Sequence, residues 1–345
     1  MNDNIDKKNP KVSVIVPVYN AGKHLYKCLD TLVNQSLSDI EIILVLDCPT
    51  DRSDDVAKSY EKQYNNIKIL SNQENLNVGL SRNNGLFHST GEYVSFADHD
   101  DYRQLDMYEE MYTIAKRENA DVLFTKEFNV RDSETVSPDL TNSADVKIET
   151  GEEFAKKCFI SLLSNSQTLP IGVVHTHIYK REFLMQNNIQ FVDAKRFAFD
   201  DNIFNLQVYD CILKNKGSIY YLPKKYYCYV SHNNNTGNTF AYRKLNNCLN
   251  ALEEIAKFPE RKNDYFPANV LHSAYRQRCV RNLYSSWRYE LKKSKIMAFK
   301  NLSIIKNYPA VCHFLKIRDK NNGSSIGQLS FSKKCFQRLL RYFYI

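Results

Sequence analysis

Short apolar runs alternate with segments of helical periodicity along the first 125 residues. The apolar runs are rich in β-branched residues and predict buried strands at 12–16, 40–47, 67–70, 92–98 and 120–125. The segments between them repeat apolar residues at helical spacing and predict helices at 24–35, 51–64 and 104–119, with a short helix or turn at 78–90. Strands that alternate with helices in this way indicate a three-layer α/β/α sandwich around a mainly parallel sheet.

The rest of the chain is predicted to hold fewer strands. A helical period begins with two acids within 197–213, a strand-like stretch follows at 217–223, and further helices are predicted at 245–258 and 269–293. We therefore expect an α/β body that ends in a mostly helical C-terminal region.

Polar side chains follow three of the predicted strands where each strand ends. Tyr19 and Asn20 come after the first strand, Asp47 ends the second and Asp98 ends the fourth. Ligands of parallel α/β sheets bind outside the carboxyl ends of the strands. One acid at a strand end is often only a helix N-cap, but polar groups at three strand ends predict a binding site.

Composition limits the class of protein. The chain has 345 residues, of which 43% are hydrophobic, so it can bury a full core. It has no apolar run of about 18 residues, and its polar start, MNDNIDKKNP, is unlike a signal peptide. Nine single cysteines without a CxxC pair argue against a disulfide framework or a zinc knuckle and favour a reducing cytoplasm.

Positive charge is concentrated towards the C-terminal end. From Leu271 onward 16 lysines and arginines face two acids, whereas the first 270 residues hold 31 basic and 37 acidic residues. Segment 332–345 mixes four basic residues with aromatic and leucine side chains, a composition typical of a helix that lies on an anionic membrane surface. The alternative is a helix that packs on its own domain or on a second subunit of a homodimer.

The segment FADHDD, residues 96–101, places three carboxylates together, and their mutual repulsion calls for a nearby cation. The sequence has neither GxxxxGK[ST] nor GxGxxG after the first strand, so it lacks a glycine-rich phosphate loop. A divalent cation can neutralise a diphosphate instead, because Mg²⁺ and Mn²⁺ take carboxylate and phosphate oxygens as ligands. We therefore expect Mn²⁺ or Mg²⁺ as a cofactor.

Two stretches taken in order resemble the family 2 glycosyltransferases, which have the GT-A fold: VSVIVPVYNAGKHLYKCLDTLVNQSLSDIEIILVLDCPTDRSDD and NVGLSRNNGLFHSTGEYVSFADHDD. The likeness is dense over residues 11–125 and thinner up to Asn235. It implies a glycosyltransferase domain at 1–238, with a nucleotide-sugar half at 11–125 and an acceptor half at 126–238. Residues 239–345 would form a basic, mostly helical C-terminal region.

The resemblance assigns the DxD element of the family to Asp98, His99 and Asp100. Asp98 would contact the ribose or the sugar and Asp100 the metal ion, while Asp101 would cap the next helix. His99 stands where the family usually has a small residue, and we place it among the nucleotide-sugar contacts without a defined role.

Further donor contacts follow from the same resemblance. Pro17, Tyr19 and Asn20 match a nucleotide-binding turn of the family. Asp47 matches the acid that reads the uracil edge of the donor, although LDCPTDRS replaces the usual DDGSTD around it. Arg82 matches an arginine that contacts the diphosphate, and the alternative for it is an ion pair with a surface acid.

The second half of the chain supplies a candidate base. Transfer with inversion needs a group that takes the proton from the acceptor hydroxyl. Asp200 and Asp201 begin the helix predicted within 197–213, and the resemblance selects Asp201 as the base. Two acids in a first helical turn also stabilise the helix dipole without any catalytic role.

Three histidines remain to be placed. His232 matches a family histidine that completes the metal or phosphate site, although Val230 replaces the usual arginine. His175 and His177 alternate along an apparent strand, and we expect them to line the acceptor pocket or to have no special role. A zinc site would need further ligands that the sequence does not offer nearby.

Together these features predict an inverting, metal-dependent glycosyltransferase of cell-surface polysaccharide synthesis. It would move a sugar from a nucleotide-diphosphate donor, by the resemblance a UDP-sugar, to a saccharide or lipid-linked glycan acceptor. We expect it in the cytoplasm, peripheral on the inner face of the cytoplasmic membrane, without a nucleic-acid partner. The alternatives are a sugar nucleotidyltransferase, which would need a basic glycine-rich loop after the first strand, and an inactive glycan- or nucleotide-binding module.

Overall fold

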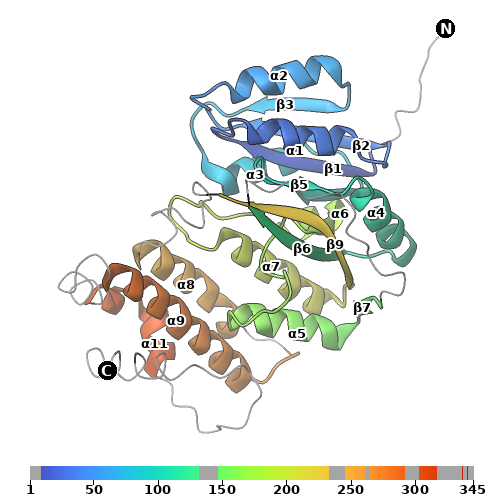
Figure 1. Ribbon diagram of the computed structural model, residues 1–345. Coiled ribbons are helices and arrows are strands. Elements are labelled where there is room, and N and C mark those ends of the chain that lie inside the picture. The colour runs from blue at the N-terminus through green and yellow to red at the C-terminus, as the bar shows by residue number, and fades with distance from the viewer. Residues whose placement is uncertain are drawn as a thin grey trace. The chain divides into compact units, whose positions relative to one another are not determined.

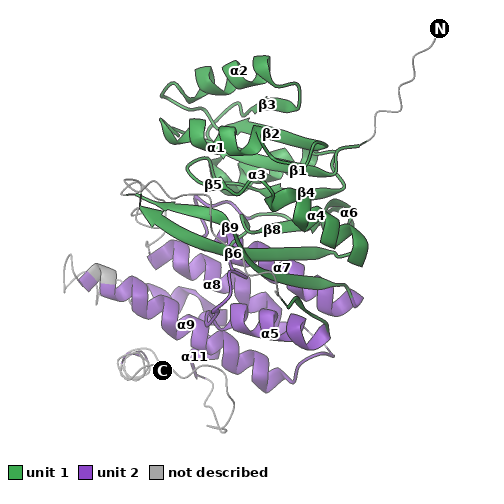
Figure 2. Ribbon diagram, turned by 45° about the vertical axis from the view of Figure 1, so that its right-hand side comes forward, with its two compact units in different colours: residues 1–151, 173–191, 217–232 green, residues 152–172, 192–216, 233–345 purple. Residues whose placement is uncertain are grey.

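The computed structural model describes residues 9–131, 147–232, 245–261, 264–291 and 303–316, together with Phe336 and Leu340 (Figure 1). The chain divides into two units, which Figure 2 distinguishes by colour. Unit 1 comprises residues 1–151, 173–191 and 217–232, and unit 2 comprises 152–172, 192–216 and 233–345. Unit 2 therefore combines two earlier segments with the C-terminal region, and the predicted domain boundary at residue 238 stays a prediction.

Unit 1 contains one sheet, which has nine strands within the described residues, in the order β3-β2-β1-β4-β8-β6-β9-β5 with β7 paired to β9. The strands are β1 (Val12–Val18), β2 (Ile40–Leu46), β3 (Ile67–Ser71), β4 (Tyr93–Phe96), β5 (Tyr102–Arg103), β6 (Val122–Arg131), β7 (Glu149–Thr150), β8 (His177–Lys180) and β9 (Ile219–Ser231). Strands β3, β2, β1 and β4 run parallel, and β8 lies antiparallel between β4 and β6. The predicted α/β fold is confirmed, and the sheet is parallel up to β4 and mixed beyond it.

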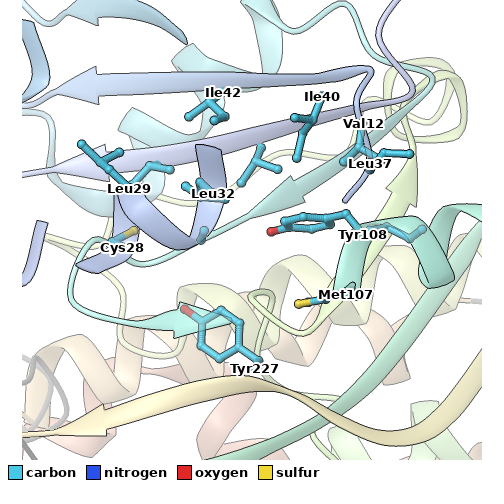
Figure 3. Close-up of a cluster of buried hydrophobic side chains, with 14 of the residues drawn as sticks. Val12, Cys28, Leu29, Leu32, Leu37, Ile40, Ile42, Met107, Tyr108 and Tyr227 are labelled. Carbon is cyan, nitrogen blue, oxygen red and sulfur yellow. The ribbon is translucent and has the colours of Figure 1, made fainter. Parts of the chain in front are cut away.

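Helices of unit 1 connect these strands, and the apolar spacing predicts those that follow β1, β2 and β5. They are α1 (His24–Val33), α2 (Ser53–Gln63), α3 (Asn77–His88), α4 (Met107–Glu118) and α6 (Arg181–Gln186). The buried face of α1, with Cys28, Leu29 and Leu32, belongs to the same core as Val12 and Ile42 of the sheet (Figure 3). Burial of this apolar face holds α1 on the sheet.

The segment predicted as a short helix or turn is the full helix α3. It lies so close to β1 that a Cβ atom at Gly85 would stand 2.3 Å from Ile15 Cγ2, which only glycine avoids. This close approach brings Arg82, one turn earlier on α3, within hydrogen-bonding distance of Asp98 after β4.

Unit 2 is helical over the described residues. It contains α5 (Glu152–Leu163), α7 (Asp200–Asn215), α8 (Leu245–Glu260), α9 (Ala268–Leu291), a 3₁₀ helix (Ser303–Asn307) and α11 (Pro309–Lys316). Helix α9 packs against α5, α8 and α11, and α7 packs against α5 and α8. None of the described helices has the length and hydropathy needed to cross a membrane.

Two parts of the basic C-terminal region are not solvated surface. Arg276 and Arg278 of α9 are buried, at 5% and 0% exposure. The predicted membrane segment 332–345 lies outside the described residues except for Phe336 and Leu340, which are also buried. The Phe336 ring centroid lies 4.9 Å from that of Trp287 on α9, so this side chain packs on its own unit.

Candidate active site

Three carboxylates lie where the chain leaves the carboxyl end of β4, and each has a different partner. Arg82 donates from Nη2 to Oδ1 of Asp98 at 2.8 Å, and the guanidinium is almost fully buried. His232 donates from Nε2 to Oδ2 of Asp100 at 2.8 Å. Asp101 is buried and accepts bonds from the Tyr227 hydroxyl at 2.8 Å and from a backbone N–H of β9 at 2.7 Å.

His175 is a further member of this cluster, although the sequence predicted for it only a place in the acceptor pocket or no special role. Its Nε2 donates to Oε2 of Glu127 at 2.5 Å, and its Nδ1 lies 3.6 Å from Oδ2 of Asp98. The ring is buried and stacks on Tyr227 with centroids 4.2 Å apart. Asp98 is therefore flanked by two side chains that can carry positive charge, Arg82 on one oxygen and His175 near the other.

A bulge in β9 brings Glu127 and Tyr227 together. Thr125 of β6 pairs with Leu222 of β9, but Glu127, two residues further on, pairs with Tyr227. The extra residues of β9 include Pro223, which has no N–H for the sheet ladder and suits a bulge. The bulge therefore sets the register in which both side chains reach His175.

The charges of the cluster shift its protonation. Burial alone would raise the pKa of Asp98, but the Arg82 charge and the bonded His175 outweigh it and hold that pKa well below its usual range. Burial alone would lower the pKa of His175, but bonding to Asp98 and Glu127 raises it to about 10. Burial, followed by the charges of Asp98 and Asp100, raises the pKa of Asp101. At neutral pH the protein thus holds an imidazolium beside an ionised Asp98.

The raised pKa of His175 predicts a pH-dependent stability difference. A group with a pKa of about 10 in the folded chain and an ordinary value of 6.5 stabilises fully below pH 6.5 and loses this contribution as the pH rises to 10. We expect the stability advantage of the native chain over His175→Gln to shrink by at least about 1 kcal/mol between pH 6 and pH 10. Denaturant unfolding of both chains across this range measures the difference.

His177 is the matched control for that experiment. Its ring is fully buried, and burial together with the His175 charge lowers its pKa well below 6.5, so it stays neutral over the tested range. The stability difference between the native chain and His177→Gln should then be flat between pH 7 and pH 10. Parallel curves for the two variants would show that His175 is not charged in the folded protein.

Two sets of side chains in the cluster offer ligand atoms to a divalent metal ion, and one of them is the pair Asp100 and His232. Ligand atoms of Asp98, Asp101 and His175 also lie within 4.8 Å of one another. Those three groups are already bonded to Arg82, Tyr227 and Glu127, and the positive charges of Arg82 and of His175 itself would repel a metal ion. The carboxylate of Asp100 and the imidazole of His232 lie 2.8 Å apart and match the ligand chemistry of Mn²⁺.

A second histidine supports His232. The His24 ring, at the start of α1, stacks on the His232 ring with centroids 4.9 Å apart and planes 13° from parallel. This stacking fixes the plane of the His232 imidazole and thus the direction of the Nε2 that meets Asp100. No signal in the sequence pairs these two histidines, which lie more than 200 positions apart.

The predicted donor residues at the carboxyl end of β1 lie near the same strand ends. Pro17 accepts a hydrogen bond at 3.0 Å on its carbonyl oxygen from Nδ1 of His99, which ties the turn after β4 to β1. Tyr19 is 46% exposed. Asn20 has a left-handed backbone with a φ of 48° and bonds through its amide to Thr50 in the loop after β2. Their predicted contacts with a nucleotide stay predictions.

Asp47 has the kind of structural role that the sequence analysis gave as the alternative for an acid at a strand end, since it caps a helix. Its carboxylate is buried and accepts three bonds, from the Asn72 amide and from the backbone N–H groups of Leu76 and Asn77 at the start of α3. It therefore caps α3. Reading of a uracil edge by Asp47 stays a prediction, as does a diphosphate contact of Arg82, whose bond in the structure goes to Asp98.

The candidate base Asp201 lies in unit 2, in the first turn of α7, as predicted. Asp200 beside it is buried, whereas Asp201 is partly exposed. Phe199, directly before the helix, has a left-handed backbone with a φ of 61°, a conformation that is rare for a bulky side chain.

The sequence of the chain is similar to those of known glycosyltransferases. The sequence model described as "Glycosyl transferase family 2" matches residues 13–187, just over half of the chain. The uncharacterized glycosyltransferase EpsJ of Bacillus subtilis is 34% identical over 204 residues, which cover 58% of this chain and 56% of EpsJ. The poly(ribitol-phosphate) β-N-acetylglucosaminyltransferase TarS of Staphylococcus aureus is 28% identical over 64% of this chain and 35% of TarS. The chain thus spans about half the length of EpsJ and about a third of TarS.

Solved structures show the same fold. TarS residues 1–349 in complex with UDP-GlcNAc superpose with a TM-score of 0.65 at 20% identity, over 89% of this chain and 81% of that one. The mannosyltransferase PcManGT of Pyrobaculum calidifontis, in complex with GDP-Man and Mn²⁺, superposes with a TM-score of 0.52 at 14% identity, over 97% and 85%. The GT-A architecture expected from the sequence is thereby confirmed.

Proposed function

The chain belongs to glycosyl transferase family 2, and from that premise we propose that it is an inverting glycosyltransferase that uses a nucleotide-diphosphate sugar. The observation that carries the proposal is the acidic cluster after β4, whose three carboxylates lie within the matched residues 13–187. There Asp98 is ionised and held by Arg82, while Asp100 lies beside His232. In a chain without a glycine-rich phosphate loop, fixed carboxylates at the carboxyl ends of parallel strands can hold the cation that neutralises a diphosphate.

Asp100 and His232 are proposed to hold Mn²⁺ or Mg²⁺. When bound, the ion would supply positive charge that stabilises the diphosphate as it leaves. Asp98, kept anionic and oriented by Arg82, is proposed to accept hydrogen bonds from the ribose or the transferred sugar. The role of the protein at this end of the reaction is thus to position the donor and to balance charge.

Asp201 is proposed to take the proton from the acceptor hydroxyl as it attacks. Such a base acts through position first and pKa second. The first turn of α7 gives a carboxylate a defined direction, since a helical backbone leaves its side chains few rotamers.

The donor is proposed to be a UDP-sugar and the acceptor a saccharide of a cell-surface polymer. The names of relatives support this class, because TarS is a poly(ribitol-phosphate) β-N-acetylglucosaminyltransferase and its structure is known with UDP-GlcNAc. A lipid-linked acceptor at the cytoplasmic face of a membrane belongs to the same proposal.

Incubation with radiolabelled sugar-nucleotides tests the function directly. UDP-GlcNAc, UDP-glucose, UDP-galactose and GDP-mannose are supplied one at a time with Mn²⁺, and slow release of nucleoside diphosphate is measured without acceptor. We expect at least one UDP-sugar to be hydrolysed and the reaction to stop when EDTA removes the metal. If no donor is hydrolysed and calorimetry detects no donor binding, the alternative of an inactive module is favoured.

A further inference from the structure

Arg278 of α9 is a buried charge without a carboxylate partner among its hydrogen bonds in the described structure. Its side chain is fully buried. Nη2 donates to Oδ1 of Asn202 at 2.6 Å, and Nη1 donates to the backbone carbonyl of Leu162 at the end of α5. Both acceptors are neutral, and Nε has no hydrogen-bond partner in the described structure. Burying a guanidinium on neutral acceptors costs free energy, so its presence at this position calls for a reason.

A second energetically unfavourable feature, the backbone conformation of Phe199, lies beside Arg278. The left-handed backbone of Phe199 precedes Asp200 and Asp201, and the Phe199 ring centroid is 5.7 Å from the Arg278 guanidinium carbon. A strained backbone of this kind persists only where its surroundings hold it, and such strain gathers at functional sites. Both features meet at the turn that carries the candidate base.

Other bonds within unit 2 hold the same turn. Asn202 donates through Nδ2 to the carbonyl of Gly172 at 2.7 Å, so it joins Arg278 to the loop before β8. Asn205, one turn on, donates to the carbonyl of Ile171 at 3.1 Å. The backbone N–H of Ala198 donates to the carbonyl of Asn247 on α8. The start of α7 is therefore fixed from α8, α9 and the 171–172 loop.

We propose that Arg278 is a positioning residue, which orients the first turn of α7 and thereby Asp201 for proton transfer. The inference rests on the proposed function for the role of Asp201. It gives the C-terminal helices a part in the reaction, because the guanidinium fork donates at once to two acceptors, one on α5 and one on α7. Lysine at this position would keep the charge but lose the fork.

The test compares Arg278→Met with Arg281→Met in the full chain. Arg281 lies on the same helix and donates to the carbonyl of Asn165 just beyond α5, so its loss controls for a weakened α9–α5 contact. Amide hydrogen exchange of residues 203–206 reports on the turn, because the N–H of Ile203 bonds to the carbonyl of Phe199. We expect Arg278→Met to speed this exchange about tenfold or more, and Arg281→Met to leave it within about twofold.

Kinetics then separate positioning from general instability. With UDP-GlcNAc and Mn²⁺ as the probe, Arg278→Met should lower kcat about 10–100-fold and leave the donor Kd within about twofold, since a misplacement of about 1 Å costs up to 10² in rate. In an Asp201→Asn background the same change should add less than about threefold, because residues that act as a unit are not additive.

The outcomes are distinct. Unchanged exchange at residues 203–206 in a folded Arg278→Met chain, or a full further loss of kcat on top of Asp201→Asn, would overturn the positioning role. If Arg278→Met does not fold, Asn202→Ala removes the acceptor on α7 and should give the same exchange and kinetic results. Full activity of Asp201→Asn would refute the proposed base, while the exchange result would still decide whether Arg278 orders the turn.

Discussion

Asp201→Asn is expected to lower kcat by about 10²–10⁴ and to leave the donor Kd nearly unchanged. Asparagine keeps the shape of the side chain and much of its hydrogen bonding, but it cannot accept the acceptor's proton. Donor binding should persist because the candidate donor and metal residues lie in unit 1, whereas Asp201 lies in unit 2. Steady-state kinetics with calorimetric measurement of donor binding gives both quantities.

Asp200→Asn is the matched control for that variant. Asp200 is a second acid in the same helical turn, and it is buried. If the two acids only stabilise the helix dipole, each replacement should cost about 0.3–1 kcal/mol of stability, and neither should change kcat by more than a small factor. Near-native turnover by Asp201→Asn would place the base elsewhere, with Asp200 and Asp193 as the next candidates.

Asp100→Ala is expected to abolish the dependence of donor binding on Mn²⁺. The change removes a proposed direct ligand and leaves only His232 of the pair that fits the ion. Calorimetric titration with a UDP-sugar, with and without Mn²⁺, should show a metal-dependent gain in affinity for the native chain and none for the variant.

Asp101→Asn provides the contrast to Asp100→Ala. The Asp101 carboxylate is used internally by Tyr227 and by the backbone of β9, and an asparagine can still accept the backbone bond. This variant should keep the metal dependence and lose only stability. If donor binding no longer depends on Mn²⁺ in Asp101→Asn but still depends on it in Asp100→Ala, the metal ion binds at the group of Asp98, Asp101 and His175 instead.

The local parts of the fold could be predicted from the sequence, because they depend on periodicity. Neighbouring residues alone identify the apolar run of β1 and the helical spacing of α1. The position of Asp98 is predicted by the end of β4, which lies just before it. The acid pair at the start of α7 was visible for the same reason. In each case the signal lies within one element.

His175 and Glu127 could not be found this way. They meet Asp98 only because β8 pairs with both β4 and β6, and because a bulge in β9 sets the register of Tyr227. Strand order and bulge position depend on contacts between distant segments. The spacing of apolar residues along the chain carries no information about such contacts. No local pattern distinguishes His175 from an ordinary core histidine.

The burial of Arg278 could have been predicted from its position in the sequence, but it was counted only as one of the basic residues of the C-terminal region. It falls on the buried stripe of α9, in step with Leu271, Tyr275 and Asn282. A basic residue at an apolar position of a helix is expected to be buried and bonded, not to face solvent or lipid. The position of each arginine on the helix would have distinguished the buried Arg278 from the exposed Arg288.

The placement of β8 has a consequence for synthesis of the chain on the ribosome. Strands β1 to β4 are complete once Phe96 has emerged, but the strand that covers the edge of β4 begins only at His177. At about 5–20 residues per second, several seconds pass before that edge is paired. During this interval the nascent chain presents an open strand, a surface that invites pairing with other chains and that chaperones are suited to shield.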